Sequence, residues 1–194
     1  MEIEDYVWVS RVAFSGGLWL TVMVDDAGVG DPVGGCVIGV LKVESEYFLW
    51  DVIPVHFFQE PLFRERRYLE EAVNVVLRCL GRVGVDEGEL IRVCRGEVFR
   101  LVRKRLAEKF RVEEVKIEGE LQFLVEEAYL DYLHSLGVPH EILTIKSGKE
   151  RFVRLLKWIY EAPEERVKLA KTGWPSWSKL DRWGRKLAGK RLET

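Results

Sequence analysis

The stretch VMVDDAGVGDPVGG, from Val22 to Gly35, decides the fold. An apolar run ends in the adjacent Asp25 and Asp26, and a loop with four glycines and one proline follows. Glycine and proline interrupt regular structure, so the run predicts a strand that ends close to Asp25. The segment is therefore either a turn between two strands or a loop that places aspartates for a metal ion or a phosphate group.

Three strands are expected around this loop. Apolar residues dominate Leu18–Val24, Cys36–Val43 and Tyr47–Val55, and the connections are short enough for antiparallel neighbours. Nearly every position of Leu18–Val24 is apolar, which indicates a strand that is buried on both faces. One more strand is expected upstream, over Tyr6–Phe14.

Helices and strands alternate after this meander. Pro61 opens a helix whose apolar stripe runs from Leu69 to Leu80. The later elements are expected as a strand at Leu90–Cys94, a helix at 97–110, a strand at 112–117, a helix at 120–136 and a short strand at 142–145. An antiparallel meander followed by βα units predicts an α/β fold, with a mixed sheet and helices on its faces.

The C-terminal segment differs from the rest of the chain in charge. From Lys146 onward there are 14 Lys and Arg against 6 Asp and Glu (net +8), and the remainder has 16 against 26 (net −10). Helices are expected at 149–161, 164–171 and 178–187, with TGWPSW as an irregular link. We therefore expect a domain at 1–145 and a basic, Trp-rich helical extension at 146–194.

The composition argues against several classes of protein. The three cysteines form no CxxC pair and do not cluster with the three histidines, so neither a disulfide framework nor a zinc knuckle is expected. The N-terminus MEIEDY is acidic, unlike a signal peptide, and no apolar run reaches the ~18 residues of a membrane span. We expect a cytoplasmic protein without a membrane partner. One Asn and two Gln favour a heat-adapted protein.

The opening loop and the element order resemble the ribonuclease H-like superfamily. Ribonuclease H begins its sheet with a strand that ends in a catalytic Asp, followed by a Gly-rich loop with Gly-Asn-Pro and by a Gly-Gly pair before the next strand. This chain has Val24-Asp25, then Gly30-Asp31-Pro32, then Gly34-Gly35 and CVIGVLKV. The loop is about one residue shorter, and Asp31 replaces Asn. The resemblance spans about residues 18–137 and implies a ribonuclease H-like mixed sheet.

The resemblance also implies chemistry. Members of this fold class hold two divalent ions on carboxylates and cleave phosphodiester bonds, and oxygen ligands suit Mg²⁺ or Mn²⁺. Asp25 matches the first ligand, whereas Asp26, as the next residue of a strand, should point to the opposite face. The family's helix Glu is matched by Glu65, one turn before Leu69. The alternative for Glu65 is a role at the helix N-terminus only.

The last two carboxylates are matched less directly. The family has an Asp at the end of the fourth strand, where this chain reads CRGE, Cys94 to Glu97, with Arg95 or Gly96 in place of the Asp. Glu97 comes slightly later and is the candidate; its alternative role is to cap a helix. Glu127 and Asp131 flank the apolar stripe of the helix at 120–136 and supply a last ligand or form an acidic, solvated face. The candidate catalytic residues are Asp25, Glu65, Glu97, Glu127 and Asp131, and the candidate metal ligands are Asp25, Glu97 and Asp131.

Basic and aromatic residues favour nucleic acid as the partner. Lys and Arg contact phosphates, and Trp stacks on unpaired bases. The candidate contacts are Arg95, Arg103, Lys171, Trp174, Trp177, Lys179, Arg182, Arg185 and Lys186. Alternatively, the tryptophans pack on the body of the protein.

Three functions follow from these patterns. The first is a divalent-metal-dependent nuclease or resolvase-like enzyme, and the alternative is a non-catalytic ribonuclease H-fold module that binds nucleic acid or protein. A nucleotide-binding protein on a related sheet is disfavoured, because GVGDPVGG lacks the Gly-Lys-Ser/Thr of a Walker motif.

Overall fold

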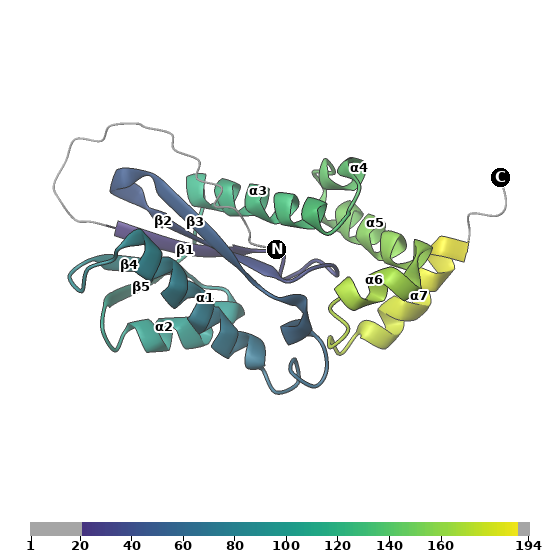
Figure 1. The fold of residues 1–194 in the computed structure, drawn as a ribbon, viewed down its shortest axis with the longest axis horizontal. Coiled ribbons are helices and arrows are strands. Elements are labelled where there is room, and N and C mark those ends of the chain that lie inside the picture. Colours follow the sequence, from purple (N-terminus) through teal and green to yellow (C-terminus); the bar gives the residue numbers. More distant parts are fainter. Residues whose placement is uncertain (1–20, 190–194) are drawn as a thin grey trace. The chain divides into compact units, whose positions relative to one another are not determined.

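The computed structural model describes residues 21–189, so the strand expected at Tyr6–Phe14 lies outside the described residues. Its centre is a five-stranded sheet in the order β3-β2-β1-β4-β5 (Figure 1). The strands are β1 Thr21–Ala27, β2 Cys36–Lys42, β3 Tyr47–Ile53, β4 Leu90–Cys94 and β5 Arg111–Val115. β1 is antiparallel to β2 and parallel to β4, and β4 is parallel to β5. This confirms the predicted mixed sheet.

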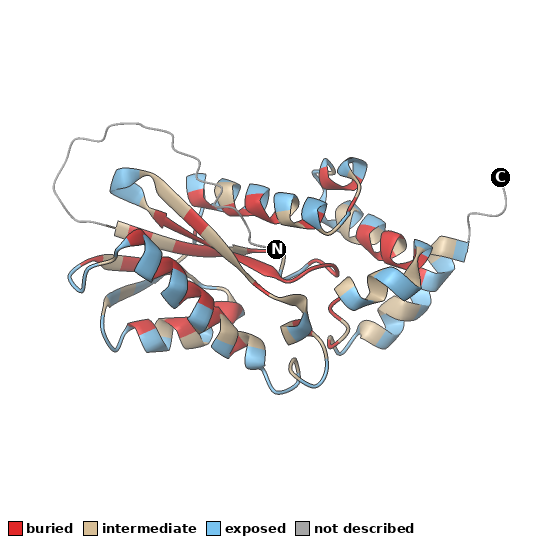
Figure 2. Ribbon diagram, in the orientation of Figure 1, coloured by how far each residue is buried: buried red, intermediate tan, exposed pale blue. Residues whose placement is uncertain are grey.

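The sheet is buried at its centre. Val22 and Val24 of β1 are fully buried, as are Val37, Ile38 and Val40 of β2, and Figure 2 shows the two strands largely in the colour of buried residues. A continuous apolar strand is expected where helices cover both faces of a sheet. β1 is therefore the central strand, as its composition predicted.

Helices cover the two faces of this sheet. α1 Arg67–Val83 and α2 Arg100–Leu106 lie on one side, and α3 Glu120–Ser135 begins on the other (Figure 1). Leu121 at the start of α3 belongs to a core cluster with Leu41 of β2 and Ile117. The 3-10 turn Glu97–Phe99 connects β4 to α2.

Two sequence-based expectations are wrong. The helix expected from Pro61 begins only at Arg67, because Arg66 adopts a left-handed backbone (φ 57°) that cannot continue a right-handed helix. The strand expected at 142–145 is a single helical turn, α4 His140–Leu143. Pro139 is its N-cap residue, and a segment as short as Ile-Leu-Thr-Ile does not by itself distinguish strand from helix.

The chain divides into two compact units. The sheet unit comprises residues 21–27, 37–52 and 69–126, and the C-terminal unit comprises residues 28–36, 53–68 and 127–189. The boundary expected at residue 145 stays a prediction. The C-terminal unit contains α5 Gly148–Glu161, α6 Pro163–Arg166 and α7 Trp177–Gly189. Every helix within the described residues is too short or too polar to span a bilayer.

α5 and α7 pack closely within the C-terminal unit. A Cβ atom at Gly184 of α7 would lie 2.1 Å from the ring of Tyr160 of α5, so only glycine allows this approach. The Tyr160 hydroxyl donates to Asp181 at 2.6 Å. The predicted basic helices therefore form a packed pair.

Candidate functional site

The register of β1 against β4 places Asp25 at an edge of the sheet unit. Val24 of β1 is opposite Val93 of β4, and the strands are parallel, so their carboxyl ends meet at the same edge. Asp25 follows Val24, and Cys94 follows Val93 as the last residue of β4. In open α/β sheets, ligands bind at the carboxyl ends of the strands.

Three side chains converge at this edge. Ligand atoms of Asp25, Asp26 and Cys94 lie within 4.8 Å of one another, and no other group of three His, Cys, Asp or Glu residues within positions 21–189 is as compact. We call these residues the DDC cluster. Asp26 was expected to point to the opposite face of the strand, yet its ligand atom lies within 4.8 Å of that of Asp25. The backbone N–H of Asp26 also donates to the Asp25 carboxylate.

Cys94 was missed as a site residue by the sequence analysis. Its role depends on the pairing of β1 with β4, which are separated by more than 60 residues of sequence, and no local pattern records that register. It is the last residue of β4, directly before Arg95 and Gly96, one of which stands where the resembling family is expected to have its Asp. Within CRGE, Glu97 is the only acidic residue, so the resemblance implied Glu97 rather than Cys94.

Burial controls the protonation of the cluster. Asp25 is 6% exposed, and this desolvation raises its pKa above the ordinary value, although hydrogen bonds from the Cys94 thiol and the Asp26 N–H oppose the shift. The negative charge of Glu126 raises the Asp25 pKa further. Burial and the hydrogen bond to Asp25 raise the pKa of Cys94 to about 11, so Cys94 is a neutral thiol that donates to the Asp25 carboxylate.

The segment after β4 is held in place by Arg103 of α2. Its guanidinium donates to the carbonyl oxygens of Cys94 (2.7 Å) and Gly96 (3.2 Å) and pairs with Glu114 of β5 at 2.9 Å. A Cβ atom at Gly96 would lie 3.2 Å from Asp26 Oδ1. Arg103 therefore orients the backbone around the DDC cluster.

The DDC cluster fits a cation. None of the ion pairs within residues 21–189 involves Asp25, although only 6% of this residue is exposed. A buried carboxylate without a cationic partner is costly, and a bound metal ion removes that cost. Bonds of about 2.0–2.4 Å to one ion join ligand atoms up to about 4.8 Å apart. Two carboxylates and a neighbouring sulfur therefore fit one divalent ion by their chemistry and spacing.

The other predicted carboxylates are exposed. Glu97, in the sheet unit, pairs with Arg100 at 3.2 Å. Glu65 lies in the turn before α1, so it is not on the apolar stripe that suggested it. Glu127 and Asp131 lie on the part of α3 that belongs to the C-terminal unit. Glu65 belongs to the same unit, through the segment 53–68. None of the four belongs to the DDC cluster.

The predicted nucleic-acid contacts differ in exposure. Lys171 is fully buried, and its ammonium donates to the carbonyl oxygens of Gly28 and Asp31, so it is occupied inside the C-terminal unit. The ring of Trp174 stacks on Phe152 with centroids 6.4 Å apart, and Trp177 is half-buried. Arg185 pairs with Asp181 at 3.1 Å. Four candidates are exposed and form no ion pair with any described residue: Arg95, Lys179, Arg182 and Lys186.

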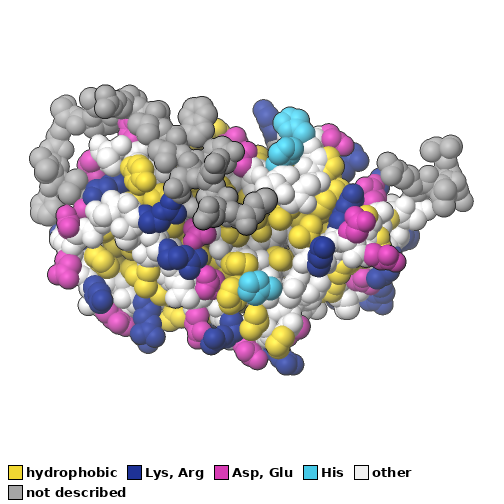
Figure 3. All heavy atoms as spheres, viewed as in Figure 1, with side chains coloured by type: hydrophobic (Ala, Val, Ile, Leu, Met, Phe, Trp, Pro, Cys, Tyr) yellow, Lys and Arg dark blue, Asp and Glu magenta, His cyan; other side chains and the backbone are white. Residues whose placement is uncertain are grey.

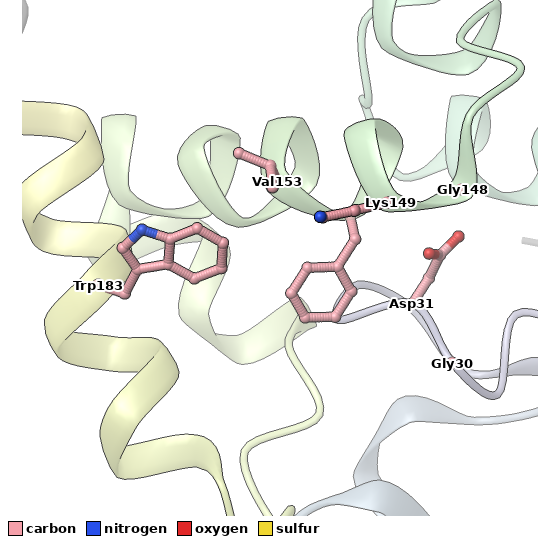
Figure 4. Close-up of a pocket in the computed structure, with 7 residues that line it drawn as sticks. Gly30, Asp31, Gly148, Lys149, Val153 and Trp183 are labelled. Carbon is pink, nitrogen blue, oxygen red and sulfur yellow. The ribbon is translucent and has the colours of Figure 1, made fainter.

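An open groove of about 500 Å³ lies within the C-terminal unit. Gly148, Lys149, Phe152 and Val153 of α5 line it together with Trp183 of α7 and the loop residues Gly30 and Asp31. Figure 4 shows the indole of Trp183 projecting from α7 into this space, with Lys149 and Val153 on the neighbouring helix. Trp183 is 40% exposed, so it is an accessible aromatic surface.

Comparison with solved structures identifies the fold. The chain is similar to the crystal structure of ribonuclease H2 from Pyrococcus horikoshii OT3, with a TM-score of 0.56 and 14% sequence identity; the match covers 86% of this chain and 99% of that chain. The chain therefore has a ribonuclease H-like fold, as the sequence resemblance implied. No family model matches the sequence, and no curated protein matches it.

Proposed function

We propose that this chain is a divalent-metal-dependent nuclease that cleaves phosphodiester bonds of nucleic acid at the DDC cluster. One observation carries the proposal: two carboxylates meet at the carboxyl end of the central strand, and the more buried one has no ion-pair partner within residues 21–189. The similarity to a ribonuclease H2 supports the same reaction class.

Each residue at the proposed site has a distinct role. Asp25 and Asp26 provide oxygen ligands, which suit Mg²⁺ or Mn²⁺. Such an ion, when bound, activates water and stabilises the leaving oxygen of a phosphodiester. Arg103 orients the segment that follows Cys94. Glu97, Glu65, Glu127 and Asp131 remain candidates for additional ligands, with Glu97 the one that shares the sheet unit with the cluster.

The C-terminal unit supplies the proposed nucleic-acid contacts. Lys179, Arg182 and Lys186 of α7 are exposed, basic and without ion pairs to described residues, so they are available to phosphates. Arg95 is a further exposed candidate in the sheet unit. On the face that Figure 3 shows, basic side chains are interspersed with acidic ones, so charge alone does not mark a binding face there. The aromatic groove beside α7 is the more specific feature.

Replacing Trp183 with alanine is expected to weaken binding of a single-stranded oligonucleotide by about 1–3 kcal/mol, or roughly 5- to 160-fold, because one base loses its stacking partner. Fluorescence anisotropy of a labelled oligonucleotide measures the change. Phe123→Ala is the matched control, since Phe123 is an exposed aromatic residue (62%) of the sheet unit. Equal affinities for the wild type and Trp183→Ala would remove Trp183 from the proposed surface.

Cleavage assays test the proposal. The full chain is incubated with labelled RNA–DNA hybrid, branched DNA, single-stranded RNA or single-stranded DNA, each with Mg²⁺, Mn²⁺ or a chelator. We expect products from at least one substrate with metal and none with the chelator. Absence of cleavage for every substrate and both ions would reject the nuclease.

One observation favours a second function. The DDC cluster contains only two carboxylates, and the residues after β4 place Arg95 where the resembling family is expected to have an Asp, so the carboxylate set is smaller than a two-ion site uses. A non-catalytic module of the same fold would bind nucleic acid or protein without cutting it. Oligonucleotide binding that depends on Trp183, together with no cleavage under any metal condition, would support this alternative.

A further inference from the structure

We infer that Cys94 is a metal ligand, and that it makes the DDC cluster prefer thiophilic divalent ions such as Co²⁺ and Zn²⁺ over Mg²⁺. The inference rests on the metal site of the proposed function but not on cleavage. It concerns the one sulfur atom of the cluster, which an all-carboxylate site would not contain.

The position of the sulfur carries the inference. Cys94 Sγ lies within 4.8 Å of carboxylate oxygens of both Asp25 and Asp26. The Cys94 thiol donates to the Asp25 carboxylate, and the Gly96 N–H donates to the sulfur. The thiol proton lies between the Cys94 sulfur and an Asp25 carboxylate oxygen. A metal ion that replaces this proton is therefore bound by the sulfur and by that oxygen. Arg103 fixes this arrangement through the carbonyl oxygens of Cys94 and Gly96.

A buried charge independently indicates a cation. Asp25 is 94% buried and takes part in no ion pair with residues 21–189. A buried carboxylate without a cationic partner costs free energy, and a bound cation removes that cost.

The donor set decides which cation binds best. Mg²⁺ requires near-octahedral oxygen ligands and retains its waters, so a sulfur atom adds little to its binding. Co²⁺ and Zn²⁺ accept thiolate together with carboxylate, and three protein ligands with one open position are a common arrangement for Zn²⁺. On binding, the Cys94 S–H bond breaks, the proton passes to solvent, and a sulfur–metal bond forms without any change of oxidation state.

The test is a titration of the metal-free full chain with Co²⁺, followed by absorbance. We expect a sulfur-to-cobalt charge-transfer band in the near ultraviolet. Calorimetry should give an affinity for Co²⁺ at least about tenfold above that for Mg²⁺. Binding of Co²⁺ without the band, or equal affinities for the two ions, would overturn the inference.

Three variants test whether the charge-transfer band arises from Cys94. Cys94→Ser should lose the band and bind Co²⁺ at least about tenfold more weakly, while its Mg²⁺ affinity stays within about threefold. Cys94→Asp should also lose the band but bind Mg²⁺ about tenfold more tightly, because it adds an oxygen ligand. Cys79→Ala, which removes a buried thiol of α1 outside the cluster, should keep it. A band that survives Cys94→Ser would overturn the inference even if one variant folds poorly.

These readouts separate the inference from the proposed function. A cobalt band that depends on Cys94 in a chain that cleaves nothing would support the ligand role and reject the nuclease. Cleavage supported by Mg²⁺ in a chain without the band would support the nuclease and reject the ligand role.

Discussion

Asp25→Asn is expected to lower the rate of metal-dependent cleavage by about 10³-fold or more. Without metal, the same variant is expected to unfold at a higher temperature than the wild type. The loss follows from removing a charged ligand, which is worth several kcal/mol to a metal-stabilised transition state. The gain in stability follows from burial. The wild-type carboxylate is 6% exposed, and desolvation raises its pKa, so its ionised form destabilises the fold at neutral pH.

The stability difference between Asp25→Asn and the wild type should depend on pH. A raised native pKa means that the native state binds the Asp25 proton more tightly than the unfolded chain does. The wild type therefore regains stability as the pH falls through the native pKa, and the gain is complete below the unfolded value of 3.8. The advantage of Asp25→Asn should be largest near pH 7 and should shrink in acid. Thermal unfolding in a chelator, at several pH values, measures it.

The matched control is Asp86→Asn, which changes the same group at an exposed turn position. We expect no change in cleavage and a change in unfolding free energy within about 0.5 kcal/mol. Adding the metal should stabilise the wild type and Asp86→Asn but not Asp25→Asn. An Asp25→Asn variant that is both active and less stable than wild type would contradict a functional role for Asp25.

Gly28→Ala is expected to destabilise the C-terminal unit by about 3 kcal/mol, which lowers the unfolding temperature by about 6–12 °C. Gly28 has a φ of +89°, which an L-residue rarely adopts. An added Cβ would also lie 2.2 Å from the ring of Tyr129, which is 1% exposed and whose hydroxyl donates to the carbonyl oxygen of Val33 at 3.0 Å. Backbone strain and overpacking against Tyr129 therefore both contribute to the loss of stability.

Gly30→Ala provides the control from the same loop. Gly30 does not have a positive φ, and nothing in the described residues lies within 4 Å of an added Cβ. We expect its unfolding free energy to stay within about 0.5 kcal/mol of wild type. Equal destabilisation by Gly28→Ala and Gly30→Ala would show that the contact with Tyr129 is not what requires glycine. Thermal or denaturant unfolding of the two variants makes the comparison.

The order of the elements was predictable because local patterns record it. The apolar run before Asp25 predicted the central strand, and the bounds of β4, Leu90–Cys94, were predicted in full. The helix at Arg67 was predicted too long, since the left-handed backbone of Arg66 leaves no mark in the pattern of apolar residues. The helical turn at His140–Leu143 was mistaken for a strand because four apolar-rich residues fit either structure.

The site was less predictable than the fold because it depends on long-range register. Asp25 was predicted as a site residue because an apolar run precedes it and a glycine-rich loop follows it. Asp26 was not expected at the site, because alternation along a strand predicts opposite faces for adjacent residues, whereas the ligand atoms of Asp25 and Asp26 come within 4.8 Å of each other. Cys94 becomes a neighbour of Asp25 only through the parallel pairing of β1 with β4. A thiol is also not the residue that a search for carboxylates looks for.

Crystals of the full chain grown with Mn²⁺ test most directly whether the DDC cluster of this ribonuclease H-like fold binds a divalent ion, because anomalous scattering locates the ion independently of any activity. We expect an anomalous peak within bonding distance of carboxylate oxygens of both Asp25 and Asp26, and loss of that peak in Asp25→Asn. An Asp25 carboxylate that is paired with a lysine or arginine, with no peak beside it, would exclude a metal site at the DDC cluster.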